Sequence, residues 1–237
     1  MLKWIAPAAC LALCAAAPAV GERQSAPRCA PSLPGKLAST GPARQLVTVV
    51  APQSRASAGS LRLWRLAGGC WLQVAGPWTA HLGANGVSAR KREGDKTTPA
   101  GIFGFEATMY GLGPDPGLRY GYHRIVCGDW WVEDSHSPFY NRFHHVRCGS
   151  KPPFRVTSED MSRSPISYRH LAVIAYNTRP IVPGRGSGIF LHVSASGQPT
   201  LGCISLTLPQ LLTVLRWLNP RNEPRIAIGT AAELPRF

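Results

Sequence analysis

The run from Gly188 to Leu206, GIFLHVSASGQPTLGCISL, contains the residues best suited to covalent chemistry. Cys203 follows Gly202 directly and lies eleven residues after His192. An imidazole within hydrogen-bond reach of a thiol raises the thiolate fraction and can carry the proton. The amides of Gly202 and Cys203 are of the kind that stabilise the oxyanion of a tetrahedral intermediate. These residue types indicate nucleophilic acyl transfer at Cys203. A buried structural cysteine with an unrelated surface histidine is the alternative.

The number of cysteines supports a free thiol in this run. Beyond residue 19 the chain has five cysteines: Cys29, Cys70, Cys127, Cys148 and Cys203. In an oxidising compartment an odd number predicts disulfides together with one free, reactive thiol. Four cysteines can pair in three ways, and we expect Cys29 with Cys70 and Cys127 with Cys148, which leaves Cys203 free. A disulfide at Cys203, with another cysteine free, is the alternative.

The first nineteen residues differ in character from the rest of the chain. Lys3 precedes an apolar run from Trp4 to Ala17, after which small residues offer a cleavage site. This is typical of a secretory signal peptide over residues 1–19, and the run is shorter than the about 20 apolar residues that span a bilayer. We therefore expect a secreted protein, extracytoplasmic or cell-wall associated, with no integral membrane segment. Lipid attachment at Cys10 or Cys14 is a less favoured alternative.

The charge of the chain is strongly positive. Its 237 residues include 26 Lys and Arg against 12 Asp and Glu, a formal net charge of +14. Such a field favours anionic partners, but no zinc-finger, basic-helix or RNA-binding aromatic signature accompanies it. Nucleic acid is therefore not expected, and a cell-wall polymer that bears carboxylates fits better. A generally basic proteome would give the same charge without a partner.

Short apolar segments bounded by Gly, Pro or Asn predict β strands in a folded part that starts near Gln45, after a flexible Pro/Ala-rich arm over 20–44. The expected strands are Gln45–Ala51, Ser60–Leu66, Cys70–Val74, Gly101–Phe105, Leu171–Tyr176, Gly188–Val193 and Arg225–Ile228. Alternation in the sixth places Phe190 and His192 on one face and the aliphatic side chains on the other. A helix is expected to begin after Thr207, with Pro209 in its first turn, and to end before Asn219.

A long irregular segment, residues 110–164, is rich in Gly, Pro, Trp and His and suggests a functional loop or lid. Five of its side chains form either a substrate wall or aromatic packing beneath a loop: Tyr122, His123, Trp130, Trp131 and Asp134. His170 either lines the cleft or is a hydrogen-bonded core histidine. Three further histidines of the segment 110–164, His136, His144 and His145, lack partners at ligand spacing, so no metal site is expected. Asp95 is expected to shape a turn.

A second run, from Gly94 to Phe103, reads GDKTTPAGIF and precedes the first in the chain. Together with His192 to Ser205 it resembles the L,D-transpeptidase catalytic domain family (YkuD-like), in particular its secreted, disulfide-containing, actinobacterial-type members. The resemblance covers residues 45–230. It implies a mainly β domain over residues 45–230, a mixed β-sheet sandwich with a short helix after the catalytic cysteine. It also implies no cofactor, and peptidoglycan stem peptides as partners.

By position, the resemblance makes Cys203 the nucleophile, His192 the base, and the amides of Gly202 and Cys203 the oxyanion donors. It implies attack on a tetrapeptide stem, release of D-alanine, and transfer of the thioester to a diaminopimelate amine of a second stem. Thr200 matches the Ser or Thr three residues before the family's nucleophile. The chain departs from the common pattern at Leu201, where a second histidine is usual, and in its shorter spacer.

The residues expected to bind substrate are Thr200, Ser205, His170, Tyr122 and Trp131. Ser205 stands where the family often has Arg or Asn. Two other functions fit the same residues: an L,D-carboxypeptidase or amidase in which water resolves the thioester, and a catalytically silent cell-wall-binding module. Nothing in the sequence indicates an oligomeric state.

Overall fold

The structure, a computed structural model, describes residues 1–2, 4, 29–157 and 160–237. Apart from residues 1, 2 and 4, the predicted signal peptide lies outside the described residues, as do residues 20–28 of the predicted arm. Within the described part of the chain, no helix is both long and apolar enough to cross a membrane.

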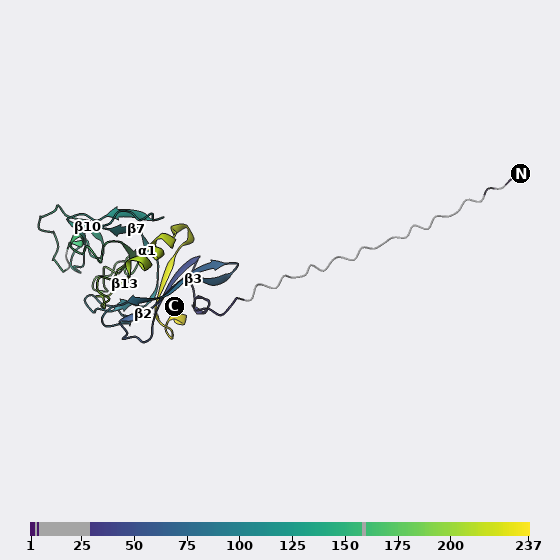
Figure 1. Cartoon of the computed structure of the whole chain (residues 1–237), viewed down its shortest axis with the longest axis horizontal. Helices are drawn as coiled ribbons and strands as arrows, with labels where there is room; N and C mark the ends of the chain where they lie inside the picture. The colour runs from purple at the N-terminus through teal and green to yellow at the C-terminus, as the bar shows by residue number, and fades with distance from the viewer. Residues whose placement is uncertain (3, 5–28, 158–159) are drawn as a thin grey trace.

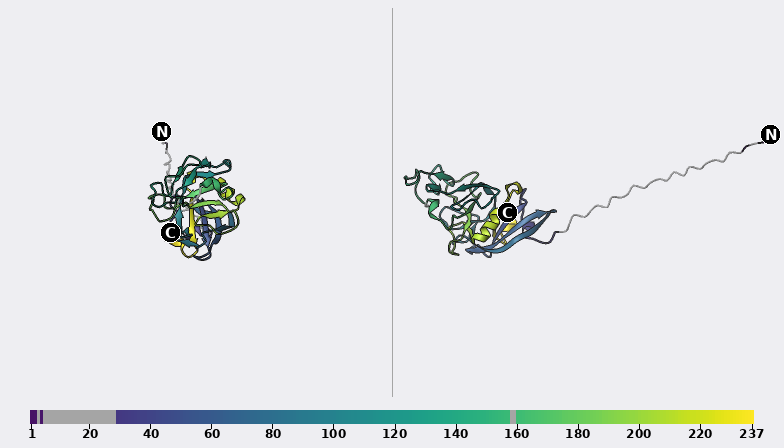
Figure 2. Two further views of the ribbon diagram at one scale, coloured as in Figure 1. Left: turned by 90° about the vertical axis from the view of Figure 1, so that its left-hand side faces the viewer. Right: turned by 45° about the horizontal axis from the view of Figure 1, so that its top comes forward.

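One large curled sheet organises the chain (Figures 1 and 2). Its ten strands follow the spatial order β6 (Gly101–Phe103), β14 (Arg225–Thr230), β1 (Gln45–Ala51), β2 (Ala58–Ala67), β3 (Cys70–His81), β13 (Ile204–Leu206), β12 (Phe190–Val193), β11 (Leu171–Ile174), β7 (Phe105–Gly111) and β8 (Gly121–Arg124). Two small sheets pair β9 (Asp129–Trp131) with β10 (Phe143–His145) and β4 (Val87–Ser88) with β5 (Thr98–Pro99). The helix α1 (Leu208–Trp217) follows β13, and short 3-10 helices lie at Pro34–Lys36, Met161–Arg163, Pro220–Asn222 and Leu234–Arg236. The expected mainly β fold with a short helix after the cysteine is confirmed.

The inner face of the curled sheet encloses the main hydrophobic core. Val47 of β1 and Leu191 of β12 are fully buried there, and α1 inserts Leu211 and Leu215. Each such side chain contributes about 1.5–3 kcal/mol when it leaves water. The Gln210 side chain caps the start of α1, because its Oε1 accepts a hydrogen bond from the Thr207 N–H at 3.3 Å. The core thus fixes α1 directly behind the strand that follows Cys203.

The opposite face of β11 and β12 carries a second apolar cluster, and Cys203 lies at its edge. Alternation along β12 sends Leu191 into the main core and Phe190 into this cluster, as the sequence predicts. The rings of Phe190 and Trp131 meet edge to face, with centroids 5.2 Å apart. His192 shares the face of Phe190, because it lies two residues further along the same strand.

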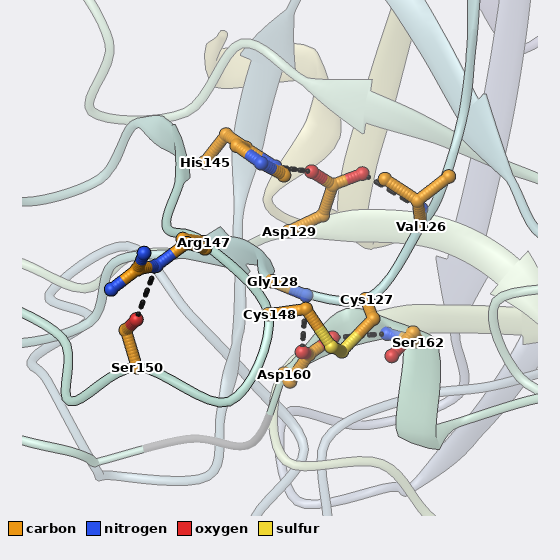
Figure 3. Close-up of a disulfide and its surroundings, with 10 residues drawn as sticks. All are labelled: Val126, Cys127, Gly128, Asp129, His145, Arg147, Cys148, Ser150, Asp160 and Ser162. Atoms are coloured by element: carbon orange, nitrogen blue, oxygen red, sulfur yellow. Dashed lines mark hydrogen bonds and ion pairs between the residues drawn. A yellow bond between two sulfur atoms is a disulfide. The ribbon is translucent and has the colours of Figure 1, made fainter.

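The segment 110–164 gathers at the end of the molecule away from the β2–β3 hairpin (Figures 1 and 2). It was expected to be irregular, yet it contains β8, β9 and β10. The Cys127–Cys148 disulfide closes the loop that carries β9 and β10 (Figure 3). Within this loop the buried Asp129 carboxylate accepts hydrogen bonds from the Val126 N–H at 2.9 Å and from His145 Nδ1 at 2.7 Å.

The described part of the predicted arm, residues 29–44, lies against the domain. A disulfide joins Cys29 to Cys70, and the Arg44 N–H donates to the Asn222 carbonyl at 2.8 Å. Leu33 packs on a third apolar cluster at the outer face of β1. Both disulfides expected from the sequence are confirmed.

Candidate active site

The two sequence motifs meet at the loop that carries Cys203. Thr200 Oγ1 donates to the Cys203 carbonyl at 2.6 Å and accepts from the Gly202 N–H at 3.1 Å. Thr98 Oγ1, from the upstream motif, lies 3.4 Å from the same carbonyl. Gly202 has a φ of +141°, and a Cβ there would lie 2.9 Å from the Thr97 carbonyl oxygen. Only glycine therefore fits before the cysteine, and both motifs hold the loop in place.

Asp95 closes the turn of the upstream motif. Its carboxylate accepts from the Thr97 N–H at 2.9 Å, from the Arg92 N–H at 2.7 Å and from Lys91 Nζ at 2.9 Å. Burial raises the pKa of the Asp95 carboxyl, but these hydrogen bonds outweigh it and hold the pKa below its ordinary value. The Lys91 side chain is 3% exposed, so its charge stays beside the nucleophile loop.

Cys203 is a free cysteine, partly exposed as a residue although its thiol group is buried, whereas the four other cysteines of the described chain form disulfides. The thiol donates to the Gly188 carbonyl at 3.2 Å, and the Phe190 N–H lies 3.4 Å from the sulfur. Burial raises the pKa of the thiol to about 12, and the charge of Glu133 adds to the rise, while Phe190 and Lys91 oppose it. The resting nucleophile is therefore a thiol and not a thiolate.

His192 is buried, and the backbone carbonyl of the next residue orients its ring. Its Nδ1 lies 2.8 Å from the Val193 carbonyl oxygen. Because a carbonyl can only accept, Nδ1 carries the proton and Nε2 has the lone pair of a base. Burial lowers the pKa of His192, so the imidazole is neutral at pH 7. The Tyr168 ring packs against His192 at 6.1 Å between centroids.

The parallel pairing of β12 and β13 sets the position of His192 relative to the nucleophile. Ser205 lies opposite His192, and Cys203 immediately precedes β13. In the described part of the chain, His192 and Cys203 are not hydrogen-bonded to each other. The Cys203 thiol donates to the Gly188 carbonyl, and His192 Nδ1 bonds to the Val193 carbonyl. Proton transfer from Cys203 to His192 would require the thiol to leave that carbonyl.

A pocket of about 750 Å³ opens at Cys203. Its walls come from residues in the segments 91–96, 133–136, 155–157, 164–168, 187–189 and 201–203. This volume is that of a cleft for a small ligand or a short peptide. Leu201, which stands where the family commonly has histidine, is 78% exposed at its rim.

Three carboxylates share this pocket with the thiol, those of Glu93, Glu133 and Asp134. Glu93 Oε2 accepts hydrogen bonds from the Tyr140 hydroxyl and from Ser187 Oγ, the latter at 2.7 Å. Burial raises the pKa of Glu133 to about 7; the charge of Glu93 adds to the rise, and that of Lys91 opposes it. Acidic and basic groups thus lie together at the nucleophile.

The structure places the residues expected to bind substrate outside the lining of this pocket. Thr200 instead shapes the nucleophile loop, and Ser205 is buried within β13. His170 and Tyr122 hydrogen-bond each other at 3.0 Å. They lie on the sheet face opposite Cys203, because alternation in β11 points Leu171 toward the cysteine cluster and His170 away from it.

Trp131 lies behind the nucleophile and not in the wall of the pocket. Its ring packs on Phe190, and its Nε1–H donates to Asn141 Oδ1 at 2.9 Å. Of the five side chains proposed for a substrate wall, Asp134 lines the pocket. The other four belong to aromatic and hydrogen-bonded packing: Tyr122, His123, Trp130 and Trp131.

The histidines of the segment 110–164 find partners other than metal. His123 and His145 bind Asp129, and His144 stacks on the Phe139 ring at 4.1 Å. In the described ranges, no group of three or more His, Cys, Asp and Glu side chains is arranged to hold a metal ion.

Lys91, Glu93 and Glu133 are charged residues of the pocket, and the sequence singled out none of them. The first two lie just before the upstream motif, and Glu133 follows the Trp130-Trp131 pair. The sequence offered one weak signal for these residues as site residues. Each is a charged residue close to a motif or to two tryptophans in a Gly- and Pro-rich segment.

The comparisons with known proteins agree with the geometry. The family model described as YkuD, L,D-transpeptidase catalytic domain, matches residues 55–228. That span includes both motifs, the disulfide of the segment 110–164 and every wall of the pocket. No curated protein and no solved structure matches the chain significantly. Because the match covers most of its length, the chain belongs to the family of L,D-transpeptidase (YkuD) catalytic domains.

Proposed function

We propose that this protein is an extracytoplasmic peptidoglycan L,D-transpeptidase that works through a thioester on Cys203. The observation that carries the proposal is the free Cys203 thiol in the wall of a 750 Å³ pocket, on a loop held by both motifs. The family acts on peptidoglycan, which supports the substrate class. Two disulfides support an oxidising compartment.

In the proposed acylation, the Cys203 sulfur attacks the carbonyl that joins the third residue of a tetrapeptide stem to its terminal D-alanine. As the C–S bond forms, the thiol proton passes to His192 Nε2. The C–N bond then breaks, and the same proton goes to the departing D-alanine amine. His192 is suited to this role because it is neutral and its Nδ1–H is fixed on the Val193 carbonyl.

The oxyanion of the tetrahedral intermediate would be bound by backbone amides of the nucleophile loop. In the resting state the Gly202 N–H donates to Thr200 Oγ1. It would therefore serve the oxyanion only after that bond opens, and we assign the first role to the Cys203 N–H. Lys91, whose Nζ would lie 3.2 Å from a Cβ at Gly202, adds positive charge at this point.

The test is incubation of the protein, without residues 1–19, with a defined tetrapeptide stem and an acceptor stem. We expect a mass increase on Cys203 equal to the tripeptide acyl group, release of D-alanine, and formation of cross-linked dimers. Cys203→Ala should show none of the three, and His192→Ala should slow D-alanine release.

The products also separate the proposal from the other functions. Tripeptides without dimers would replace the transferase with a carboxypeptidase. Absence of any acyl-enzyme, with Cys203 shown free by thiol mapping, would overturn the enzymatic proposal and leave a wall-binding module.

A further inference from the structure

The carboxylate of Glu133 is the one acidic group of the pocket for which the structure shows no task in holding the fold. Glu93 accepts from two hydroxyl groups, and Asp134 accepts from the Arg155 and His136 N–H groups. No hydrogen bond or ion pair to Glu133 occurs in the described part of the chain. The carboxylate is nonetheless largely buried, and burying a charge costs free energy unless it is paired or hydrogen-bonded.

Glu133 and the reacting sulfur both lie against Gly188. A Cβ at Gly188 would stand 2.8 Å from Glu133 Oε1, and the carbonyl of that same residue accepts the Cys203 thiol at 3.2 Å. Both Glu133 and Cys203 line the pocket, and the charge of the carboxylate acts on the thiol. A thioester formed on Cys203 would therefore lie beside this carboxylate.

We propose that Glu133 is a second catalytic residue, which binds the acceptor ammonium group and takes its proton before the amine attacks the thioester. The inference rests on the proposed function and assigns a group to its second half. An amino group at neutral pH is protonated and cannot attack a carbonyl until it loses a proton. A carboxylate without a partner, beside the thioester, attracts this cation and accepts that proton.

The ammonium gives one proton to Glu133, and the neutral amine attacks the thioester carbonyl. The new C–N bond forms, the C–S bond breaks, and the second amine proton returns to the departing sulfur through His192. The thiol is restored, and Glu133 releases its proton to solvent.

The charges around Glu133 determine when it can act as a base. Burial and the negative charge of Glu93 make protonation easier, and the positive charge of Lys91 makes it harder. The other charged or titratable groups of the pocket are Lys96, Asp134, His136, Arg155, Tyr168 and Cys203. The pKa of Glu133 is about 7, so the carboxylate form, and with it the transfer rate, rises as pH increases through 7.

The experiment compares the two half-reactions in Glu133→Gln and in the wild type. We expect the acyl-enzyme of Glu133→Gln to accumulate and dimer formation to fall by about 100-fold, the scale of a general base. The first burst of D-alanine release should be as fast as in the wild type or faster, because loss of the negative charge lowers the pKa of Cys203. The residual transfer of the variant should lose its inflection near pH 7.

The matched control is Glu106→Gln, an acid that pairs with the exposed Arg179 and lies outside this pocket. It should retain both rates. Equal transfer by Glu133→Gln and the wild type, with an unchanged pH profile, would refute the role of Glu133 while leaving the proposed function standing. A wild type that never forms an acyl-enzyme would instead refute the proposed function itself. Equal slowing of both half-reactions would show a structural role and would also refute the inference.

Discussion

Lys91 places a positive charge beside the nucleophile loop. Its side chain is buried, its Nζ is bound to Asp95 at 2.9 Å, and its charge lowers the pKa of Cys203 against the effect of burial. In Lys91→Met this charge is lost, so the thiolate becomes harder to form. We expect acylation by the tetrapeptide to slow by about tenfold, the equivalent of a pKa change of about one. The measurement is the burst of D-alanine release at pH 7.

The control for this variant is Lys36→Met, which removes an exposed lysine that does not line the pocket. It should acylate at the wild-type rate. If Lys91→Met also acylates at that rate, the lysine serves the turn through Asp95 and has no part in thiol activation.

The sequence was sufficient to identify the residues that have a local signature. The odd number of cysteines and the run from His192 to Ser205 pointed to Cys203 as a free thiol. Gly202 was singled out because it directly precedes that cysteine. Glu133 had no such signature, because what distinguishes it is proximity to Gly188, which is more than fifty residues away in the chain. The partners that perturb a titratable group come from tertiary structure, and no sequence period reports them.

Among the elements, the hairpin of β9 and β10 carries the wall that ends in Glu133. The Cys127–Cys148 disulfide encloses this hairpin in a loop with a sequence separation of 21 residues. Replacing both cysteines by alanine should lower the free energy of unfolding by about 3 kcal/mol, from the greater entropy of the unfolded chain. The wall should also loosen, so dimer formation should fall. Guanidinium denaturation and the transpeptidation assay measure the two effects.

The disulfide Cys29–Cys70 provides the comparison. Its sequence separation is 41 residues, so its loss should cost a similar free energy, about 4 kcal/mol. It joins the arm to the β2–β3 hairpin, away from the pocket lining. At a temperature where both variants are folded, its removal should leave dimer formation unchanged. Equal losses of activity in both variants would show that the effect is one of global stability.

The elements differed in how well the sequence predicted them. Residues 45–51 form β1 within the expected bounds, and α1 lies where its cap and apolar spacing placed it. β3 continues beyond the expected end at Val74 to His81, past a register shift opposite Leu61. Gly76 makes this irregularity possible at a φ of +82°, since a Cβ there would lie 2.5 Å from the Leu61 carbonyl oxygen. The irregularity breaks the alternation on which a strand prediction depends.

At the scale of the whole molecule, the field outside the pocket and the charges inside it serve different steps. The net charge of +14 favours approach to an anionic polymer. The pocket lining includes charges of both signs: Lys91 and Arg155 are basic, and Glu93 and Glu133 are acidic. A donor stem brings carboxylates, and an acceptor brings an ammonium group. The mixture of charges therefore suits the proposed transpeptidase, whose pocket would bind both.

The buried carboxyl group of Glu133 makes the stability of the whole domain depend on pH. The folded protein keeps a proton on Glu133 up to about pH 7, whereas an ordinary glutamate loses it near pH 4.5. Between these values the unfolded chain binds fewer protons than the folded one, so the free energy of unfolding falls as pH rises. Above pH 7 the buried carboxylate lowers the free energy of unfolding by its full amount, on the order of 3 kcal/mol, because each pKa unit corresponds to about 1.4 kcal/mol.

Glu133→Gln should therefore be more stable than the wild type at pH 7.5 by up to about 3 kcal/mol, and the two should be equally stable at pH 4. The comparison is made by chemical denaturation at both pH values. Glu106→Gln, which breaks an exposed ion pair, should change stability by less than about 1 kcal/mol at either pH. A gain in stability together with a loss of transfer identifies a charge that the fold tolerates for its chemistry. A loss of stability in Glu133→Gln at pH 7.5 would instead mean that the carboxylate holds the wall together, and its assignment as a base would fail.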